Sequence, residues 1–222
     1  MTARVNQGTY LVSNDNSPAD PRCNRRGELV VVDFWTQLVL DGRMFHIQVG
    51  TEDAPVNSTT GVDDEMVWAM ADNPVGVTML PAFAQVQLSA LATGTAPVVM
   101  LEVDRGKARW SSGGTAFVPE NLRTDRPAVS QATAYVGTDI TTGAKTAVPG
   151  SMEIWRAAWF EDAIATGTGA EFKETFWCAK SKNIPVAIVG TGSLLLHFGA
   201  ATADITGYGC LQWAELPTSA VT

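Results

Sequence analysis

The sequence predicts an all-β protein, a single jelly-roll-like antiparallel β-sandwich with an extended N-terminal arm. Runs rich in β-branched and aromatic residues recur along the 222 residues and are separated by clusters of Gly, Pro, Asn, Asp and Thr. Roughly eight to ten such runs follow one another without βαβ alternation, which favours two packed antiparallel sheets. The chain has no internal repeat of fixed period, which disfavours a propeller or a solenoid.

We expect three regions along the chain. Residues 1–27 contain the polar, proline-containing stretch SPADPRCNRRG, which can bury little apolar area and is expected to form an arm or an extended loop. Residues 28–216 supply the strands of one large sandwich, and 217–222 are expected to form a flexible tail.

The arm carries a group of three arginines, Arg22, Arg25 and Arg26. A group of this kind is commonly a solvated loop, and the alternative is an ion-pairing contact with an acidic neighbour. We therefore treat these three residues as candidate contacts to a protein shell or to another subunit.

The strongest strand is predicted over 28–40, in the stretch ELVVVDFWTQLVL, with apolar residues on both of its faces. Two apolar faces indicate that both are covered, one by a second sheet and the other by a subunit or the arm. Trp35 on this strand is therefore a further candidate contact residue. The dipeptide Asp41-Gly42 indicates a two-residue hairpin, so 44–50 is expected to return as an antiparallel strand.

The middle of the chain continues with strands that are separated by turns. Residues 66–70 fit either a short helical turn capped by Asp63 or Asp64 or a strand. Residues 152–163 are also ambiguous, and a strand is favoured there because the neighbouring elements are strands. Further strands are expected at 75–80 and 83–91 on either side of Pro81, at 98–104, 109–110, 116–118, 135–136, 172–179, 186–189, 193–198 and 208–215.

Composition and charge limit the classes of partner. The net charge of −8 and the pI of about 4.7 oppose binding to the phosphates of nucleic acid, which requires clustered Lys and Arg. Only 17% of residues are charged, below the roughly 25% of an ordinary soluble domain, so we expect another protein to cover part of the surface.

No run of about 18 apolar residues and no apolar signal-peptide core occurs in the sequence. We therefore expect synthesis in the cytoplasm without a membrane step. The three cysteines, at 23, 178 and 210, are far apart, so they are expected to be reduced, structural thiols.

Candidate catalytic and metal-binding residues are few. His46 and His197 are the two histidines, and each falls within a strand pattern. Metal-binding jelly rolls of the cupin type carry a His-x-His pair on one strand, whereas here Gln48 stands where the second histidine would be. Cys178, His197 and Asp204 supply the residue types of a nucleophile, base and orienter, but no local motif activates the thiol. We therefore expect no catalytic residue, no metal and no cofactor.

Two further patterns concern ligand binding. The acidic loop residues 63–65, with Glu52 and Asp53 near them in sequence, lack the spacing of a calcium loop and favour a solvated loop. The seven tryptophans suit core or interface packing, with carbohydrate stacking as the alternative. They stand at 35, 68, 110, 155, 159, 177 and 213.

Residues 66–127 carry a family resemblance. The segment NPVGVTMLPAFAQVQLSA, followed by VVMLEVDRGKARWSSGGTAFVPENLRTDRP, resembles structural proteins of tailed-bacteriophage virions of the jelly-roll capsid decoration type. The resemblance covers between a third and a half of the chain and consists of structural motifs, so it supplies no catalytic residues. It implies a protein located on the virion surface that binds the major capsid protein.

Together these observations predict a non-enzymatic virion protein that stabilises a capsid as a homo-oligomer, with a trimer favoured by analogy with other sandwich subunits. The first alternative is a carbohydrate-binding receptor module on a tail or fibre. The second alternative is a cupin-like metalloenzyme that uses His46.

Overall fold

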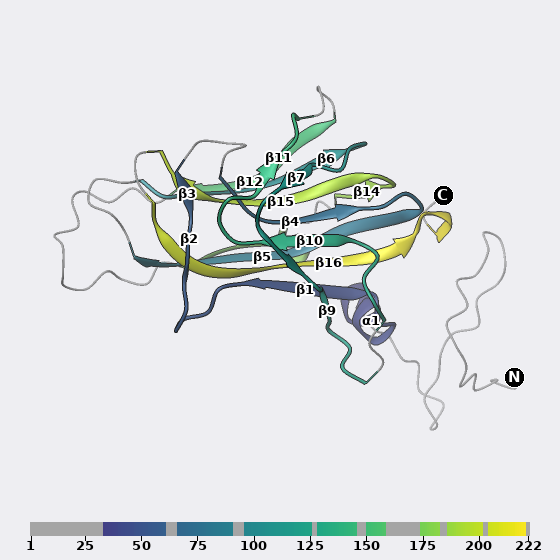
Figure 1. The fold of residues 1–222 in the computed structure, drawn as a ribbon. Helices are drawn as coiled ribbons and strands as arrows, with labels where there is room; N and C mark the ends of the chain where they lie inside the picture. Colours follow the sequence, from purple (N-terminus) through teal and green to yellow (C-terminus); the bar gives the residue numbers. More distant parts are fainter. Residues whose placement is uncertain are drawn as a thin grey trace, which may run out of the picture.

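The chain forms two antiparallel sheets that face one another across an apolar core (Figure 1). The computed structural model describes residues 33–60, 66–90, 96–125, 128–145, 150–158, 174–182, 186–201 and 204–220. The predicted all-β sandwich is confirmed.

The first sheet has the order β13-β5-β16-β1-β9, with β14 paired to β5 and β2 paired to β16. The second sheet has the order β12-β6-β15-β4-β10-β8, and β3 pairs with β15 in parallel. The first sheet contains β1 (Met44–Val49), β2 (Val56–Asn57), β5 (Val77–Ala90), β9 (Glu120–Asn121), β13 (Glu174–Cys178), β14 (Ile188–Val189) and β16 (Thr206–Pro217). The second contains β3 (Thr59–Thr60), β4 (Val67–Asn73), β6 (Val98–Arg105), β8 (Thr115–Phe117), β10 (Thr133–Val136), β12 (Ser151–Ala158) and β15 (Gly192–Ala200).

The strand order is that of a jelly roll. When the eight longest described strands are numbered along the chain, the two sheets read 6-3-8-1 and 5-4-7-2. Strand 1 therefore pairs with 8, 2 with 7, 3 with 6 and 4 with 5, as in one long hairpin rolled into two facing sheets. The predicted jelly roll is thus correct in topology as well as in class.

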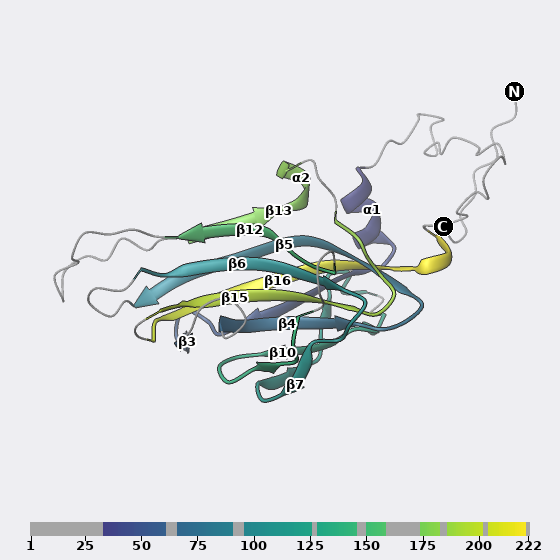
Figure 2. The same cartoon turned by 90° about the horizontal axis from the view of Figure 1, so that it is seen from above.

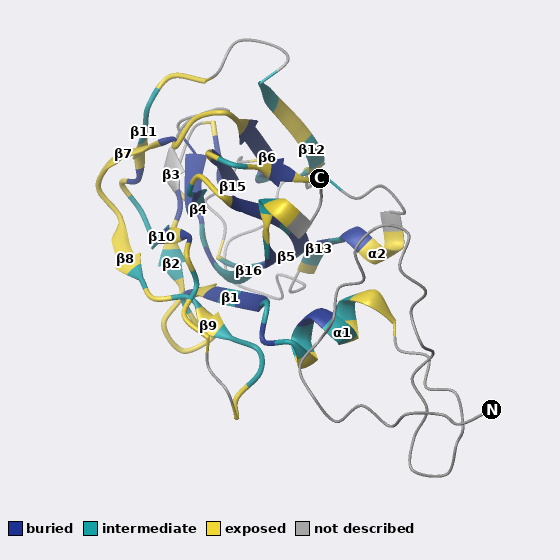
Figure 3. Cartoon of the chain, turned by 90° about the vertical axis from the view of Figure 1, so that its right-hand side faces the viewer, coloured by how far each residue is buried: buried dark blue, intermediate teal, exposed yellow. Residues whose placement is uncertain are grey.

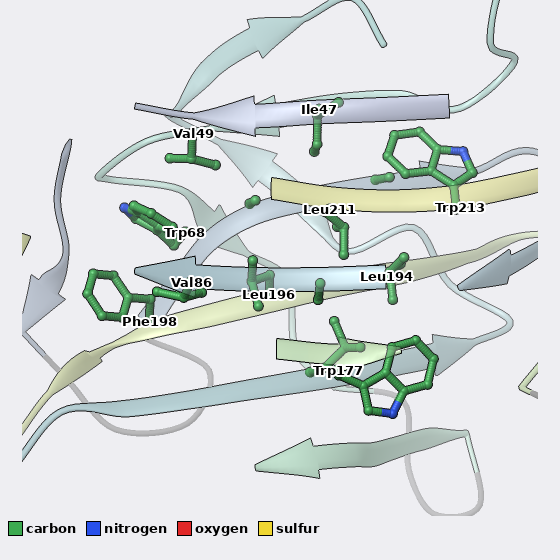
Figure 4. Packing of buried hydrophobic residues seen from close by; sticks show 14 of the residues in the cluster. Ile47, Val49, Trp68, Val86, Trp177, Leu194, Leu196, Phe198, Leu211 and Trp213 are labelled. Atoms are coloured by element: carbon green, nitrogen blue, oxygen red, sulfur yellow. The ribbon is translucent and has the colours of Figure 1, made fainter. Parts of the chain in front are cut away.

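The core is built from the inward-facing side chains of the two sheets. In β1, Ile47 is fully buried against the opposite sheet, while the side chains on either side of it in sequence point outward. Trp68 and Phe198 meet in the core with ring centroids 4.8 Å apart, and Leu211 and Trp213 extend the same cluster along the sheets (Figure 4). Burial of these large side chains supplies the main stabilisation of the sandwich.

The strand predicted over 28–40 is wrong where the structure describes it. Residues 28–32 lie outside the described residues, and Phe34–Leu40 form helix α1. Asp33 caps the helix by accepting a hydrogen bond from the Thr36 amide at 3.2 Å. Trp35 and Leu38, three residues apart, both contact the sheet, as a helical period allows and a strand period does not.

A turn forms at Asp41-Gly42 as predicted, but it is not a hairpin turn. Gly42 has φ of +69°, and its amide donates to Val39 O while the Arg43 amide donates to Leu38 O. This pair of bonds is a Schellman motif, which ends a helix. The turn therefore joins α1 to β1 instead of closing a hairpin, and the strand expected at 44–50 is confirmed as β1.

The other ambiguous elements are strands. Residues 67–73 form β4, so the helical alternative is wrong there, and 151–158 form β12 as favoured. Strand β5 runs through Pro81 without a break. On one side of β5, β13 pairs as far as Phe83 and β14 begins at Met79, so Pro81 occupies the gap between them and no ladder bond is lost on that side.

The remaining elements occupy the periphery. The segment between β6 and β12 crosses the outer face of the second sheet and contains a two-stranded sheet of β7 (Trp110–Ser112) and β11 (Thr141–Thr142). Helices α1 and α2 (Ala179–Lys182) lie at the opposite side of the sandwich (Figure 2). Thr218–Ala220, expected to belong to a flexible tail, form a 3-10 helix whose Thr218 amide donates to Gly76 O.

Candidate functional site

An apolar groove lies between α1 and the outer face of the first sheet. Helix α1 packs on this face through Leu38, which contacts Met44, Ala82 and Ala214. Because α1 covers only part of the sheet, a groove of about 290 Å³ remains beside it, bounded by β5 and by the end of β13. Its walls are mostly apolar, and the residues that line it are Trp35, Thr36, Val39, Met44, Ala82, Phe83, Leu122, Cys178, Lys180 and Gln212.

Two residues that line the groove, Trp35 and Phe83, each contact a further aromatic ring. On α1, Phe34 lies against Trp35 with ring centroids 5.4 Å apart in an edge-to-face arrangement. On the sheet, Phe83 stacks on Phe176 with centroids 6.1 Å apart. Phe34 and Phe176 are 54% and 55% exposed. Such exposure is unusual, because an aromatic ring is a large apolar surface that is normally covered. Figure 3 shows α1 and α2 side by side with exposed residues on their outward surfaces.

One ion pair lies at the edge of the groove. Lys180 Nζ is 3.6 Å from Asp33 Oδ1, and both side chains are well exposed. The hydroxyl and amide of Thr36 donate to Asp33, and these hydrogen bonds lower the pKa of its carboxyl group. Asp33 is thus held as an anion next to the cation of Lys180.

A buried charged network occupies the opposite outer face, under the segment that carries β7 and β11. Arg109 is fully buried, and its Nη1 lies 3.2 Å from Asp104 Oδ2 and 3.4 Å from Glu102 Oε1. Arg109 Nε donates to Gly143 O at 2.7 Å. The network therefore ties the segment between β6 and β12 to the second sheet through charge-assisted hydrogen bonds.

Asp72 and Ser193 extend the same network to β4 and β15. The Asp72 carboxylate accepts from the amides of Arg109 and Trp110, both at 3.1 Å, and from the Ser193 hydroxyl. Ser193 Oγ accepts in turn from the Arg109 amide at 2.8 Å. These bonds satisfy the backbone amides of Arg109 and Trp110 at the start of β7.

The surroundings of Glu102 strongly lower the pKa of its carboxyl group. Burial by itself would raise its pKa, but hydrogen bonds with His197 and Ser151, together with the charges of His197 and Lys145, outweigh burial and lower the pKa to about 2. His197 Nε2 lies 3.5 Å and Lys145 Nζ 3.2 Å from Glu102 Oε2. The arrangement keeps Glu102 ionised and gives the network a structural role.

The two histidines do not converge on a metal site. His46 points to the outer face of the first sheet, where Gln212 Nε2 lies 3.4 Å from its Nδ1 and burial lowers its pKa. His197 is buried at the outer face of the second sheet, and Gln48 is exposed. In the described residues no group of three or more His, Cys, Asp or Glu side chains could hold a metal ion. The space between the sheets, where both faces converge, is filled by apolar side chains.

The other candidate constellations are also separated in space. Cys178 lines the groove on the first sheet, whereas His197 lies on the far side of the sandwich, so the two cannot act together. Burial raises the pKa of Cys210 to about 11, which keeps that thiol protonated. The acidic residues 63–65 lie outside the described residues.

The tryptophans divide between core and surface. Trp68, Trp177 and Trp213 are buried, as expected for core packing. Trp110 is 38% exposed and stacks face to face on Tyr135, with centroids 4.2 Å apart and planes 2° from parallel. Tyr135 therefore covers one face of Trp110, and the exposed part of the Trp110 ring is the surface on which a sugar could stack.

Among the predicted contact residues, Trp35 lies in the groove, and Arg22, Arg25 and Arg26 lie outside the described residues. Phe34, Phe176 and Lys180 complete the surface around Trp35, and sequence analysis did not select them. The proximity of α1 to α2 has no signal in the sequence, because it depends on long-range strand pairing that places β1 and β13 in the same sheet.

The chain matches no protein-family model, no curated protein and no solved structure. No helix in the described part of the chain has the length and apolar character needed to cross a membrane.

Proposed function

We propose that this chain is a non-enzymatic structural protein of a tailed-bacteriophage virion, which decorates the capsid and stabilises it through contacts between copies and with the shell. The jelly-roll strand order carries the proposal, because this fold serves viral capsid proteins as well as lectins and cupins. Fold alone does not define function, so the choice among these classes depends on the surface.

The surface favours adhesion over catalysis. A catalytic or metal site needs converging polar side chains, whereas the groove beside α1 is mostly apolar and has aromatic edges. Exposed aromatic rings around a groove are typical of protein contacts, where a few such anchors supply most of the binding energy. The low content of charged residues also suits a protein whose surface is partly covered.

A binding experiment with capsids tests the proposal. Full-length protein is mixed with particles that were assembled from the genome encoding this chain and that lack the protein, and the bound fraction is measured by sedimentation. We expect saturable binding to the shell. Absence of binding at micromolar protein would overturn the proposal.

The arm arginines supply a variant for the same assay. Simultaneous Arg22→Ala, Arg25→Ala and Arg26→Ala substitutions are expected to weaken shell binding at least about tenfold, because ion pairs at the shell would be lost. The control is Arg105→Ala with Arg156→Ala, which removes two exposed arginines from the sandwich. Equal binding by both variants would contradict a role for the arm.

A carbohydrate-binding module of a tail or fibre is the second candidate, and the partly exposed ring of Trp110 favours it. A glycan array separates the two functions, since a stacking site predicts sugar binding that Trp110→Ala abolishes. Absence of glycan binding by the wild-type chain would remove this candidate.

A further inference from the structure

We propose that the groove beside α1 is a two-fold contact in which two copies of this chain each insert Phe34 into the groove of the other. The inference names the partner in the self-association part of the proposed function and rests on it. Its evidence is the self-complementary shape and charge of one small surface.

The surface offers both halves of a two-fold contact, because an exposed aromatic ring and an apolar groove lie next to each other. Phe34 projects from the first turn of α1 and is 54% exposed, while the groove next to it is bounded by Trp35 and Phe83. A surface that contains both a projecting ring and a matching cavity satisfies the requirement of an isologous contact, in which the same patch is used by both partners. Phe176, which is 55% exposed and stacks on Phe83 of the groove wall, would be covered by the same contact.

The charges on this surface are self-complementary as well. Lys180 and Asp33, 3.6 Å apart, lie at the groove edge. A two-fold rotation about an axis near them places the Lys180 of each copy close to the Asp33 of the other. The pair then becomes a four-charge arrangement of alternating sign, which favours pairing between identical chains that otherwise repel through their net charge of −8.

A two-fold contact produces pairs, which differs from the trimer expected from the sequence. A trimer requires a heterologous surface, where the projecting group and the cavity belong to different patches. Because both lie on one patch here, a dimer is the species that this surface by itself produces.

The solution mass of the full chain tests the contact without any capsid. Sedimentation equilibrium of the wild type is expected to show a monomer–dimer equilibrium, and Phe34→Ala is expected to weaken it at least about tenfold, as loss of a central aromatic anchor does. Val75→Ala is the matched control, because Val75 is 82% exposed in the β4–β5 turn and should leave the equilibrium unchanged. A wild type that stays monomeric, or a dimer that Phe34→Ala does not weaken, would overturn the proposal.

A disulfide trap tests the geometry directly. Cys178 lines the groove, so Phe34→Cys in a Cys23→Ser background is expected to form an intermolecular disulfide with Cys178 under mild oxidation and to migrate as a covalent dimer. Val75→Cys in the same background is expected to remain a monomer. Absence of any covalent dimer of the Phe34→Cys protein would overturn the two-fold contact.

The outcomes for contact and function are separable. A monomeric protein that still coats the capsid would overturn this contact and leave the proposed function intact. A dimer that fails to bind capsids would overturn the proposed function and leave this contact intact.

Discussion

Replacing Arg109 with methionine tests the buried charged network most sharply. Arg109 is fully buried, and removing it leaves the carboxylates of Asp104 and Glu102 without the guanidinium that lies 3.2 and 3.4 Å from them. Breaking a buried pair by removing one partner typically costs about 3–5 kcal/mol. Lys145, 3.2 Å from Glu102, retains part of the compensation, so we expect the lower end, about 3 kcal/mol of unfolding free energy.

The assay is chemical and thermal unfolding of the full chain at neutral pH. For a chain of this size, about 3 kcal/mol corresponds to a fall in Tm of roughly 6–12 °C. Hydrogen exchange then locates the damage, which should be greatest at β7 and β11 because Arg109 ties this segment to the second sheet.

Arg156→Met is the matched control. Arg156 also forms an ion pair, with Glu153 at 2.8 Å, but both side chains are about 40% exposed. Such surface pairs contribute about 0–1 kcal/mol, so this variant should unfold nearly as the wild type does. If the two methionine variants differed by less than about 0.5 kcal/mol, the reasoning about buried charge would be refuted.

The remaining predictions concern single side chains. Glu102→Gln should remove up to about 3 kcal/mol of unfolding free energy above pH 4.5. Because the pKa of Glu102 is lowered in the folded state, the difference from wild type should vanish as the pH falls from 4.5 to about 2. Denaturation curves that show the same difference at every pH would contradict this. Gly209→Ala places a Cβ 2.2 Å from the Gln85 carbonyl oxygen and should lower the unfolding free energy by about 3 kcal/mol. Gly76→Ala meets no atom but has φ of +85°, so it should lower the unfolding free energy by about 1 kcal/mol. Equal losses in urea titrations would contradict this reasoning. Phe198→Ala should destabilise the fold by about 3–5 kcal/mol, and a thermal shift of only 1–2 °C would show that its core contacts are weaker than its burial indicates.

The strands could be predicted because their alternation is local. In β5, the residues Ala84, Val86 and Leu88 are buried and their neighbours less so, a period that is visible in the sequence. Helix α1 was missed because a seven-residue element shows barely two turns, and its apolar residues fit both periods. The signals that could have identified it are Asp33 as a cap and Gly42 just past the end.

The buried network and the groove depend on contacts between residues far apart in sequence. Glu102 and Asp104 lie two residues apart on one face of β6, and no local pattern in the sequence indicates that Arg109 would cover them. Likewise Trp35 could be selected as a contact residue, whereas Phe176 reaches the same surface only through the packing of β13 on β5. Contacts between residues far apart in sequence leave no local pattern from which they could be predicted.

Cryo-electron microscopy of virions assembled from the genome that encodes this chain tests the central claim most directly. The account predicts symmetric copies of the jelly roll on the outer surface of the capsid, in contact with the major capsid protein. Purified virions whose shells carry no density for this fold, and whose protein content lacks the chain, would contradict it.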